Sequence, residues 1–363
     1  MPGDAIIGVC HHRRGSPTVK SPLATALLLA LALPAAATAA DPTATPPASV
    51  AANAAEARFQ AIYEKEWKWR QSGGGEANED ADGPALATRM PDVGAQAQAK
   101  RLAVWDDVLR QLDTLDVASM SDEARINLAI YRDQVQNSAD EIRFGAYEMP
   151  FNSDSSFWSN LSFMARREMK TPAEYRAYIA RLNDVPRYFD QQTDNMRAGL
   201  ARGFSVPREV LDGRDVSIST VAELRDAAES PLYAPFKSLP ASIPAAEQKA
   251  LQAQARSAIE RSVIPAFGKL LTFFREEYVP KSRTTLAAEA LPDGKAFYQQ
   301  QIREYTTLDL TPEQIHAIGL EEVARIQREM DAIIKEVGFK GTFGEFLTFL
   351  RTDPQFYAKT PDE

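Results

Sequence analysis

Apolar side chains recur at the spacing of an α-helix along most of the chain, and this pattern limits the possible fold more than any other feature. Residues three or four apart share one face of a helix, whereas a strand alternates every second residue. Four helical stripes are visible, at residues 102–112, 124–135, 175–189 and 315–337. Alternation appears only at residues 216–219, a short candidate strand. The sequence therefore predicts an all-α, mainly helical fold with more than ~60% helix, well above the average of globular proteins.

Capping signals mark the beginnings of these helices. In a capping box, a Thr side chain binds the backbone of the third helical residue, whose Glu or Gln side chain reaches back. Pro is favoured at the first helical position. Five segments fit this pattern, at residues 171–174, 220–223, 311–314, 342–345 and 360–363. Because the last one begins a helix where the sequence stops, we expect residues 55–363 to be a helical domain truncated at its C-terminal end.

Gly and Pro residues predict breaks between and within the helices. Gly338 stands where a left-handed C-terminal cap belongs. Pro186 and Pro265 fall inside apolar stripes, where the missing N–H should kink or divide a helix. Residues 71–94 contain three consecutive glycines and an acidic run, which indicate a loop between helices.

The first forty residues have the parts of a secretory signal peptide. Basic residues precede a Leu/Ala-rich run at 23–33, and small residues follow it. This run is shorter than the ~20 apolar residues that span a bilayer. We therefore expect residues 1–40 to be removed near Ala39 or Ala40, leaving an exported protein, periplasmic or secreted, with no stable membrane insertion. The Pro/Thr/Ala-rich residues 41–54 predict a flexible linker.

Composition limits the partners and the chemistry. Residues 1–40 carry three basic and one acidic side chain, so their removal changes the formal net charge from −9 to −11. Such an acidic chain argues against binding to nucleic acid or anionic lipid. The single cysteine, Cys10, leaves with the signal peptide, so no thiol remains for a disulfide, a metal or a nucleophile.

His316 is the only histidine after residue 40. One His and no Cys cannot supply the ligands of a hydrolytic zinc ion, and no Gly-x-Ser-x-Gly turn presents a serine for a triad. We therefore predict no catalytic residue, no metal ligand and no cofactor in this chain. Glu313 lies one turn before His316 and could pair with it, although a structural role for this histidine is the favoured interpretation. Adjacent carboxylates point about 100° apart on a helix and are assigned to solvated faces. They occur at residues 106–107, 276–277 and 321–322.

Four aromatic residues are interleaved with Asn and Ser in the least helix-like part of the chain. They are Phe151, Phe157, Trp158 and Phe163. Such a cluster could line a cleft, but aromatic side chains more often fill the core. Core packing is the favoured interpretation, and a cleft stays open as the alternative.

Several segments resemble a bacterial family called domain of unknown function 885. They are LPDGKAFY at 291–298, IREYTTLDLTPEQIH at 302–316, GLEEVARI at 319–326, FLRTDPQFY at 349–357, and a series of shorter matches within 181–208. The similarity runs from about Phe59 to the end. It implies the N-terminal portion of a large helical fold related in architecture to helical zinc metallopeptidases. The family's His-Glu-Ala-x-Pro-Gly-His-His and Glu-Gly-Trp-Ala-Leu-Tyr motifs lie further along and do not occur here.

The resemblance also implies a function. The chain would be the N-terminal portion of an exported, metal-dependent hydrolase of peptide or related amide bonds, inactive alone, with zinc in the full-length protein. The substrate would be a peptide or small amide. Tyr298, Tyr305 and His316 are the polar residues of the best-matched segment that could face this substrate, as donors to its carbonyl. The alternative is a non-catalytic helical envelope protein that binds a peptide or protein partner in a cleft.

Overall fold

The computed structural model describes residues 53–73, 87–152 and 155–362. Helices make up 73% of these residues, and their only β-pairing is an isolated bridge between Phe151 and Ser156. The prediction of an all-α fold is therefore confirmed. The predicted signal peptide and nearly all of the predicted linker lie outside the described residues.

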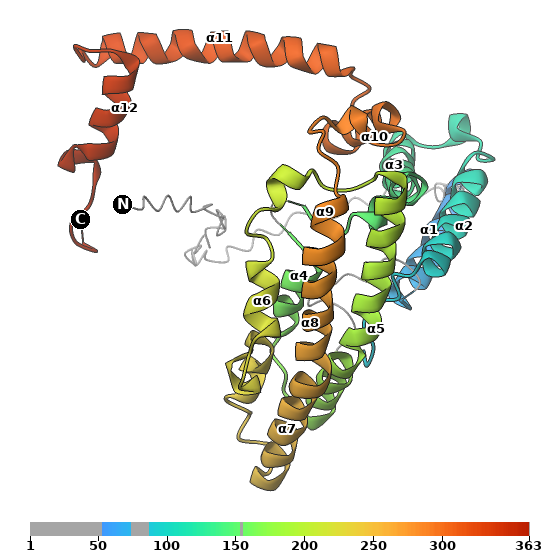
Figure 1. Cartoon of the computed structure of the whole chain (residues 1–363). Helices are drawn as coiled ribbons and strands as arrows, with labels where there is room; N and C mark the ends of the chain where they lie inside the picture. Colours follow the sequence, from blue (N-terminus) through green and yellow to red (C-terminus); the bar gives the residue numbers. More distant parts are fainter. Residues whose placement is uncertain (1–52, 74–86, 153–154, 363) are drawn as a thin grey trace, which may run out of the picture. The chain divides into compact units, whose positions relative to one another are not determined.

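Figure 1 shows the helices of the described residues. In chain order they are α1 (Ala54–Gln71), α2 (Ala95–Leu112), α3 (Asp122–Phe144), α4 (Phe157–Met164), α5 (Pro172–Arg202), α6 (Val216–Ala222), α7 (Ala245–Ala258), α8 (Ile264–Phe273), α9 (Val279–Lys281), α10 (Gly294–Thr306), α11 (Pro312–Glu336) and α12 (Phe343–Thr352). Short 3₁₀ segments lie between several of them. Of the predicted loop at 71–94, the described residues 72–73 and 87–94 form no helix, and residues 74–86 lie outside the described part of the chain.

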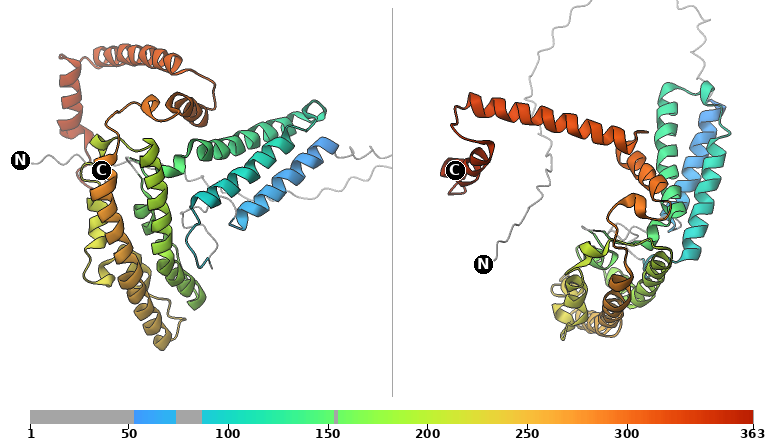
Figure 2. Two further views of the ribbon diagram at one scale, coloured as in Figure 1. Left: turned by 45° about the vertical axis from the view of Figure 1, so that its right-hand side comes forward. Right: turned by 45° about the horizontal axis from the view of Figure 1, so that its top comes forward.

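The first three helices pack side by side (Figure 2). The predicted stripes of α2 and α3 form most of their shared core, together with two residues of α1. These buried residues include Phe59, Ile62, Trp105, Leu109, Leu112, Leu128, Tyr131 and Val135. The linker was predicted to extend to residue 54, but its described residues, 53 and 54, belong to the beginning of α1. Asn53 is the N-cap of this helix and accepts a hydrogen bond from the Ala55 N–H.

A second, larger core surrounds α5, which packs against α7 and α8. The stripe of α5 is buried along its length, and Leu182, Val185 and Tyr188 are completely inaccessible. Most of the aromatic cluster also lies in this core, which supports core packing over a cleft. The exception is Phe163, which is 37% exposed and lies beneath the Arg166 guanidinium, 4.6 Å from the ring centre.

Helices α7, α8 and α9 are joined without a break by two wider π-helical turns, Ile259–Val263 and Phe274–Tyr278. Pro265 lies in the first turn of α8, directly after the first π turn, and Pro280 follows the second. A wider turn accommodates the hydrogen bond that a proline cannot make. Neither proline divides its helix: a π turn precedes Pro265 while the helix continues, and α5 runs without division through Pro186.

The capping boxes at Thr171, Thr311 and Thr342 are confirmed, as is the left-handed Gly338 at a φ of 68°. The box at Thr220 is wrong, because this residue lies inside α6 and its hydroxyl donates to the Val216 carbonyl at 2.7 Å.

The predicted strand at residues 216–219 is also wrong. These residues form most of α6, where Ile218 is fully buried, and α6 packs against α8. The helix expected to begin at Thr360 is not formed either, since bends and turns occupy residues 359–362. Four residues cannot support a helix, because its nucleus fixes several residues for the first hydrogen bond.

Candidate functional site

The three predicted substrate-facing residues lie on α10 and at the start of α11. Tyr298 and Tyr305 are 42% and 81% exposed, and their separation of seven residues places them on one face of α10. His316 is exposed in the first turns of α11. The structure therefore leaves all three side chains accessible to solvent, and their role toward a substrate stays a prediction.

Helix α11 carries an apolar face that no described residue covers. It is a complete helix of 25 residues with a capping box, yet neither it nor α12 contains a buried residue. Counting its C-cap residue Val337, it carries six apolar side chains that are 44–67% exposed: Ile318, Leu320, Val323, Ile326, Ile333 and Val337. Contiguous exposed apolar patches larger than a few hundred Å² mark contact surfaces.

Helix α12 is also exposed and contains no buried residue. The Phe339 ring, in the turn after α11, contacts the rings of Phe346 and Phe349 at 5.2 and 5.3 Å between centroids. Phe349 in turn meets Phe356 at 5.3 Å. These aromatic contacts fold α12 against the end of α11, while Leu350 and Phe356 stay exposed. We call the exposed apolar residues of α11 together with Leu350 and Phe356 the α11–α12 apolar face.

Glu66, which was not predicted as a site residue, is buried inside the bundle of α1, α2 and α3. Only 1% of its side chain is exposed. One carboxylate oxygen accepts from the Arg70 Nε and Nη2 atoms at 3.0 and 2.8 Å and from the Trp105 indole N–H at 3.4 Å. The other accepts from the Tyr131 hydroxyl at 3.2 Å. Burial, followed by the charge of Glu66, raises the pKa of Tyr131 well above its ordinary value, so this phenol stays protonated and donates.

A cavity of about 290 Å³ opens beside Glu66. Its walls are mainly apolar, from Ile62, Trp69 and Val108, with Lys65 among the polar residues that line it. The Arg70, Trp105 and Tyr131 donors are already engaged with the Glu66 carboxylate, so this arrangement holds three helices together. The position was visible in the sequence as an acidic residue on the apolar side of α1, four residues after Ile62.

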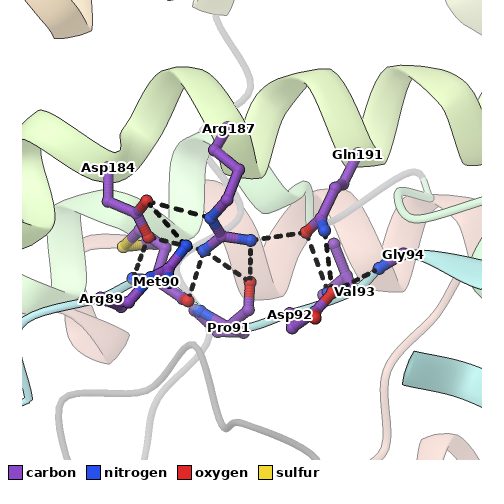
Figure 3. A network of polar contacts seen from close by, with 9 residues as sticks. All are labelled: Arg89, Met90, Pro91, Asp92, Val93, Gly94, Asp184, Arg187 and Gln191. Atoms are coloured by element: carbon purple, nitrogen blue, oxygen red, sulfur yellow. Dashed lines mark hydrogen bonds and ion pairs between the residues drawn. The ribbon is translucent and has the colours of Figure 1, made fainter. Parts of the chain in front are cut away.

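A polar network holds an extended segment, residues 89–94, along α5 (Figure 3). The side chains that bind it are Asp184, Arg187, Gln191 and Asn195, spaced at three and four residues and therefore on one face of the helix. They contact mainly the backbone of the segment, so the interaction depends on its extended conformation more than on its side chains.

Arg187 is the centre of this network (Figure 3). It donates to both oxygens of Asp184, at 3.0 and 2.6 Å, and to the carbonyls of Met90 and Pro91, at 2.6 and 3.2 Å. The Met90 N–H donates back to Asp184 at 2.8 Å. Burial alone would raise the pKa of Asp184, but the hydrogen bonds from Arg187 and Met90 and the charges of Arg187 and Arg89 outweigh it and lower this pKa below its ordinary value.

Gln191 and Asn195 complete the attachment. The Gln191 side-chain oxygen accepts from the Val93 N–H at 3.2 Å, and its amide donates to the Asp92 carboxylate at 2.8 Å. The Asn195 amide donates to the Val93 carbonyl at 2.8 Å. The ladder on α5 thus satisfies an extended backbone as a neighbouring strand would, and here it fixes the entry of the chain into α2.

The predicted lack of a metal site can be compared only with the described part of the chain. Within it, no group of three or more His, Cys, Asp or Glu side chains is arranged to hold a metal ion. Of the adjacent carboxylates, Asp106 pairs with Arg143, Asp107 with Arg110, Glu277 with Arg197 and Glu322 with Arg325. Among the same described residues, no helix is both long and apolar enough to cross a membrane.

Comparisons with known proteins bear on the family and the fold. A family model described as "Bacterial protein of unknown function (DUF885)" matches residues 75–363. No curated protein matches the chain. A solved structure, described as the "putative lipoprotein from Colwellia psychrerythraea", is similar with a TM-score of 0.63 at 20% sequence identity. The similarity covers 83% of this chain and 54% of that protein, so the chain spans about half of its length.

Proposed function

We propose a function for this chain, which belongs to the DUF885 family of bacterial proteins of unknown function. In this proposal it is the N-terminal portion of a metal-dependent hydrolase of peptide or related amide bonds. The whole protein would be exported, periplasmic or secreted. The observation that carries this proposal is the α11–α12 apolar face, taken with the greater length of the similar solved protein.

The free energy of helix formation explains why this face requires a cover. An amphipathic helix in water gains most of its stability from burying its apolar stripe. The six exposed apolar residues of α11 would contribute roughly 1 kcal/mol or more each if buried, on the order of 10 kcal/mol in total. In the proposal, the remainder of the whole protein packs on this face and brings the catalytic groups to it.

Metal-dependent hydrolysis needs about three protein ligands, an open coordination position and a carboxylate base. The described residues do not fit a metal ion, so in this proposal the ligands belong to the remainder of the whole protein, with zinc as the expected ion. This chain would contribute Tyr298 and Tyr305 as donors to the substrate carbonyl, with His316 near the same site. Their exposure on α10 and α11 leaves them free to meet a substrate.

The alternative is a non-catalytic helical envelope protein that binds a peptide or protein partner. The ladder on α5 favours it, because Asp184, Arg187, Gln191 and Asn195 show that this fold can bind an extended backbone through side chains. Some proteins bind peptides through such backbone contacts.

The experiment that separates the two functions is a hydrolysis assay of the purified whole protein on a panel of short peptides and small amides, with and without a chelator. The hydrolase proposal predicts cleavage that a chelator abolishes and that zinc restores. Tyr298→Phe and Tyr305→Phe should lower kcat without changing the bound metal. Peptide binding without cleavage in the metal-loaded protein would refute the hydrolase and leave the binding protein.

A further inference from the structure

Arg181 is a buried cation on α5 that lacks a described anionic partner. It is only 8% exposed, one turn after Tyr178. Its Nε–H group is completely buried and has no hydrogen-bond partner among the described residues. A guanidinium carries five N–H donors and stays protonated at neutral pH, so its burial without a partner is costly.

The acidic residues on either side of Arg181 along α5 are engaged elsewhere. Glu174 accepts hydrogen bonds from the Lys170 and Thr171 N–H groups, at 2.9 and 2.8 Å, as part of the capping box. Asp184 is occupied by Arg187 and by the Met90 N–H. Neither carboxylate is therefore available to neutralise Arg181.

Two neighbouring side chains, Tyr178 and Arg167, act on the pKa of Arg181. Burial lowers the pKa of Arg181 below its ordinary value, the neighbouring Tyr178 opposes this shift, and the positive charge of Arg167, in the turn after α4, adds a smaller lowering. Tyr178 does not neutralise Arg181, since its hydroxyl donates to the Leu232 carbonyl at 2.9 Å and burial raises the pKa of this phenol far above neutrality. Arg181 thus lies beside a tyrosine that stays neutral.

We propose that Arg181 binds a small oxyanion, a single carboxylate or phosphate group. The planar guanidinium fork matches both groups and binds them through two parallel hydrogen bonds. Such a ligand would accept a hydrogen bond from the Nε–H and would offset the free-energy cost of burying Arg181. The inference uses no residue assigned to hydrolysis and stands independently of the proposed function.

The test is titration of the full chain with inorganic phosphate and with acetate, each compared with chloride at equal ionic strength, while Tm and binding heat are measured. Phosphate also stabilises proteins without specific binding, so the informative quantity is the difference between wild type and variant. We expect wild type to bind the anion saturably and Arg181→Met to abolish this binding. Arg181→Lys keeps the charge but loses the guanidinium fork, so it should lower the affinity for the anion roughly tenfold or more. A short peptide with a free C-terminal carboxylate, compared with its amidated form, distinguishes a peptide from a free anion as the source.

Arg176→Met is the matched control, since Arg176 is on the same helix, is exposed and pairs with Glu247. It should leave the affinity for the anion unchanged. The proposal fails if wild type shows no saturable binding, or if Arg181→Met binds phosphate and acetate as well as wild type does. Because Arg181→Lys keeps the buried charge, it still provides a test if the Met variant does not fold.

Discussion

Replacing Glu66 by Ala should destabilise the bundle of α1, α2 and α3 more than any surface substitution on α1. The change removes a carboxylate that is only 1% exposed. It leaves the Arg70 guanidinium, the Trp105 indole N–H and the Tyr131 hydroxyl without their acceptor.

The magnitude follows from what is left behind. Breaking a buried ion pair by removing one partner costs about 3–5 kcal/mol, because the remaining charge stays uncompensated. Arg70 can partly reach solvent, since 33% of its side chain is exposed, which limits its own penalty. The buried Tyr131 and Trp105 donors cannot, and each unsatisfied group costs about 1–3 kcal/mol. We therefore expect Glu66→Ala to lower the free energy of unfolding by about 3–5 kcal/mol.

Urea unfolding, followed by circular dichroism and by tryptophan fluorescence, measures this loss. Glu64→Ala is the control on the same helix, because Glu64 is half exposed and pairs with Lys68 at 3.8 Å; its loss should be below about 1 kcal/mol. A third variant, Glu66→Gln, keeps an acceptor for Trp105 or Tyr131 and should lie between the two. If Glu66→Ala costs no more than Glu64→Ala, then Glu66 does not hold the three helices together and the reasoning is refuted.

Three further predictions concern α5 and α11. Arg187→Met should release residues 89–94 and cost about 2–4 kcal/mol, seen as faster hydrogen exchange at the Met90 amide; unchanged exchange would contradict it. The pKa of Asp184 is lowered in the folded state. The stability that its ionised carboxylate contributes is therefore complete above the pKa of the unfolded carboxyl, about 4, and is lost as the pH falls through the folded pKa. The free energy of unfolding of Asp184→Asn should accordingly depend less on pH in acid than that of wild type. The chain alone should self-associate through α11, as measured by analytical ultracentrifugation. Val323→Lys should shift it toward the monomer without changing its helix content. A monomeric wild type would contradict this prediction.

Local signals in the sequence were sufficient for most of the helices. The boxes at Thr171, Thr311 and Thr342 succeeded because a capping box involves only four neighbouring residues. The short segment at 216–219 failed because four residues do not distinguish a period of 2 from one of 3.6. Its conformation is decided by Ile218, which is buried where α6 packs against α8.

The features that bear on function depend on contacts between distant residues, and the sequence alone could not supply them. Glu66 was detectable as an acidic residue on an apolar stripe, but its partners Trp105 and Tyr131 come from other helices. Likewise, nothing local shows that Arg187 binds a segment almost one hundred residues earlier. The stripe of α11 was predicted as a helix correctly, yet whether a face is buried depends on what packs on it.

The central claim is that this chain is the N-terminal portion of a metal-dependent hydrolase whose metal ligands lie in the rest of the whole protein. The most direct test is the metal content, by elemental analysis, of two purified proteins, residues 41–363 and the whole protein, after equal exposure to zinc and removal of free metal. The account predicts about one tightly bound zinc per whole protein and none in residues 41–363. Stoichiometric zinc in residues 41–363, removed by a chelator together with peptide hydrolysis, would contradict it.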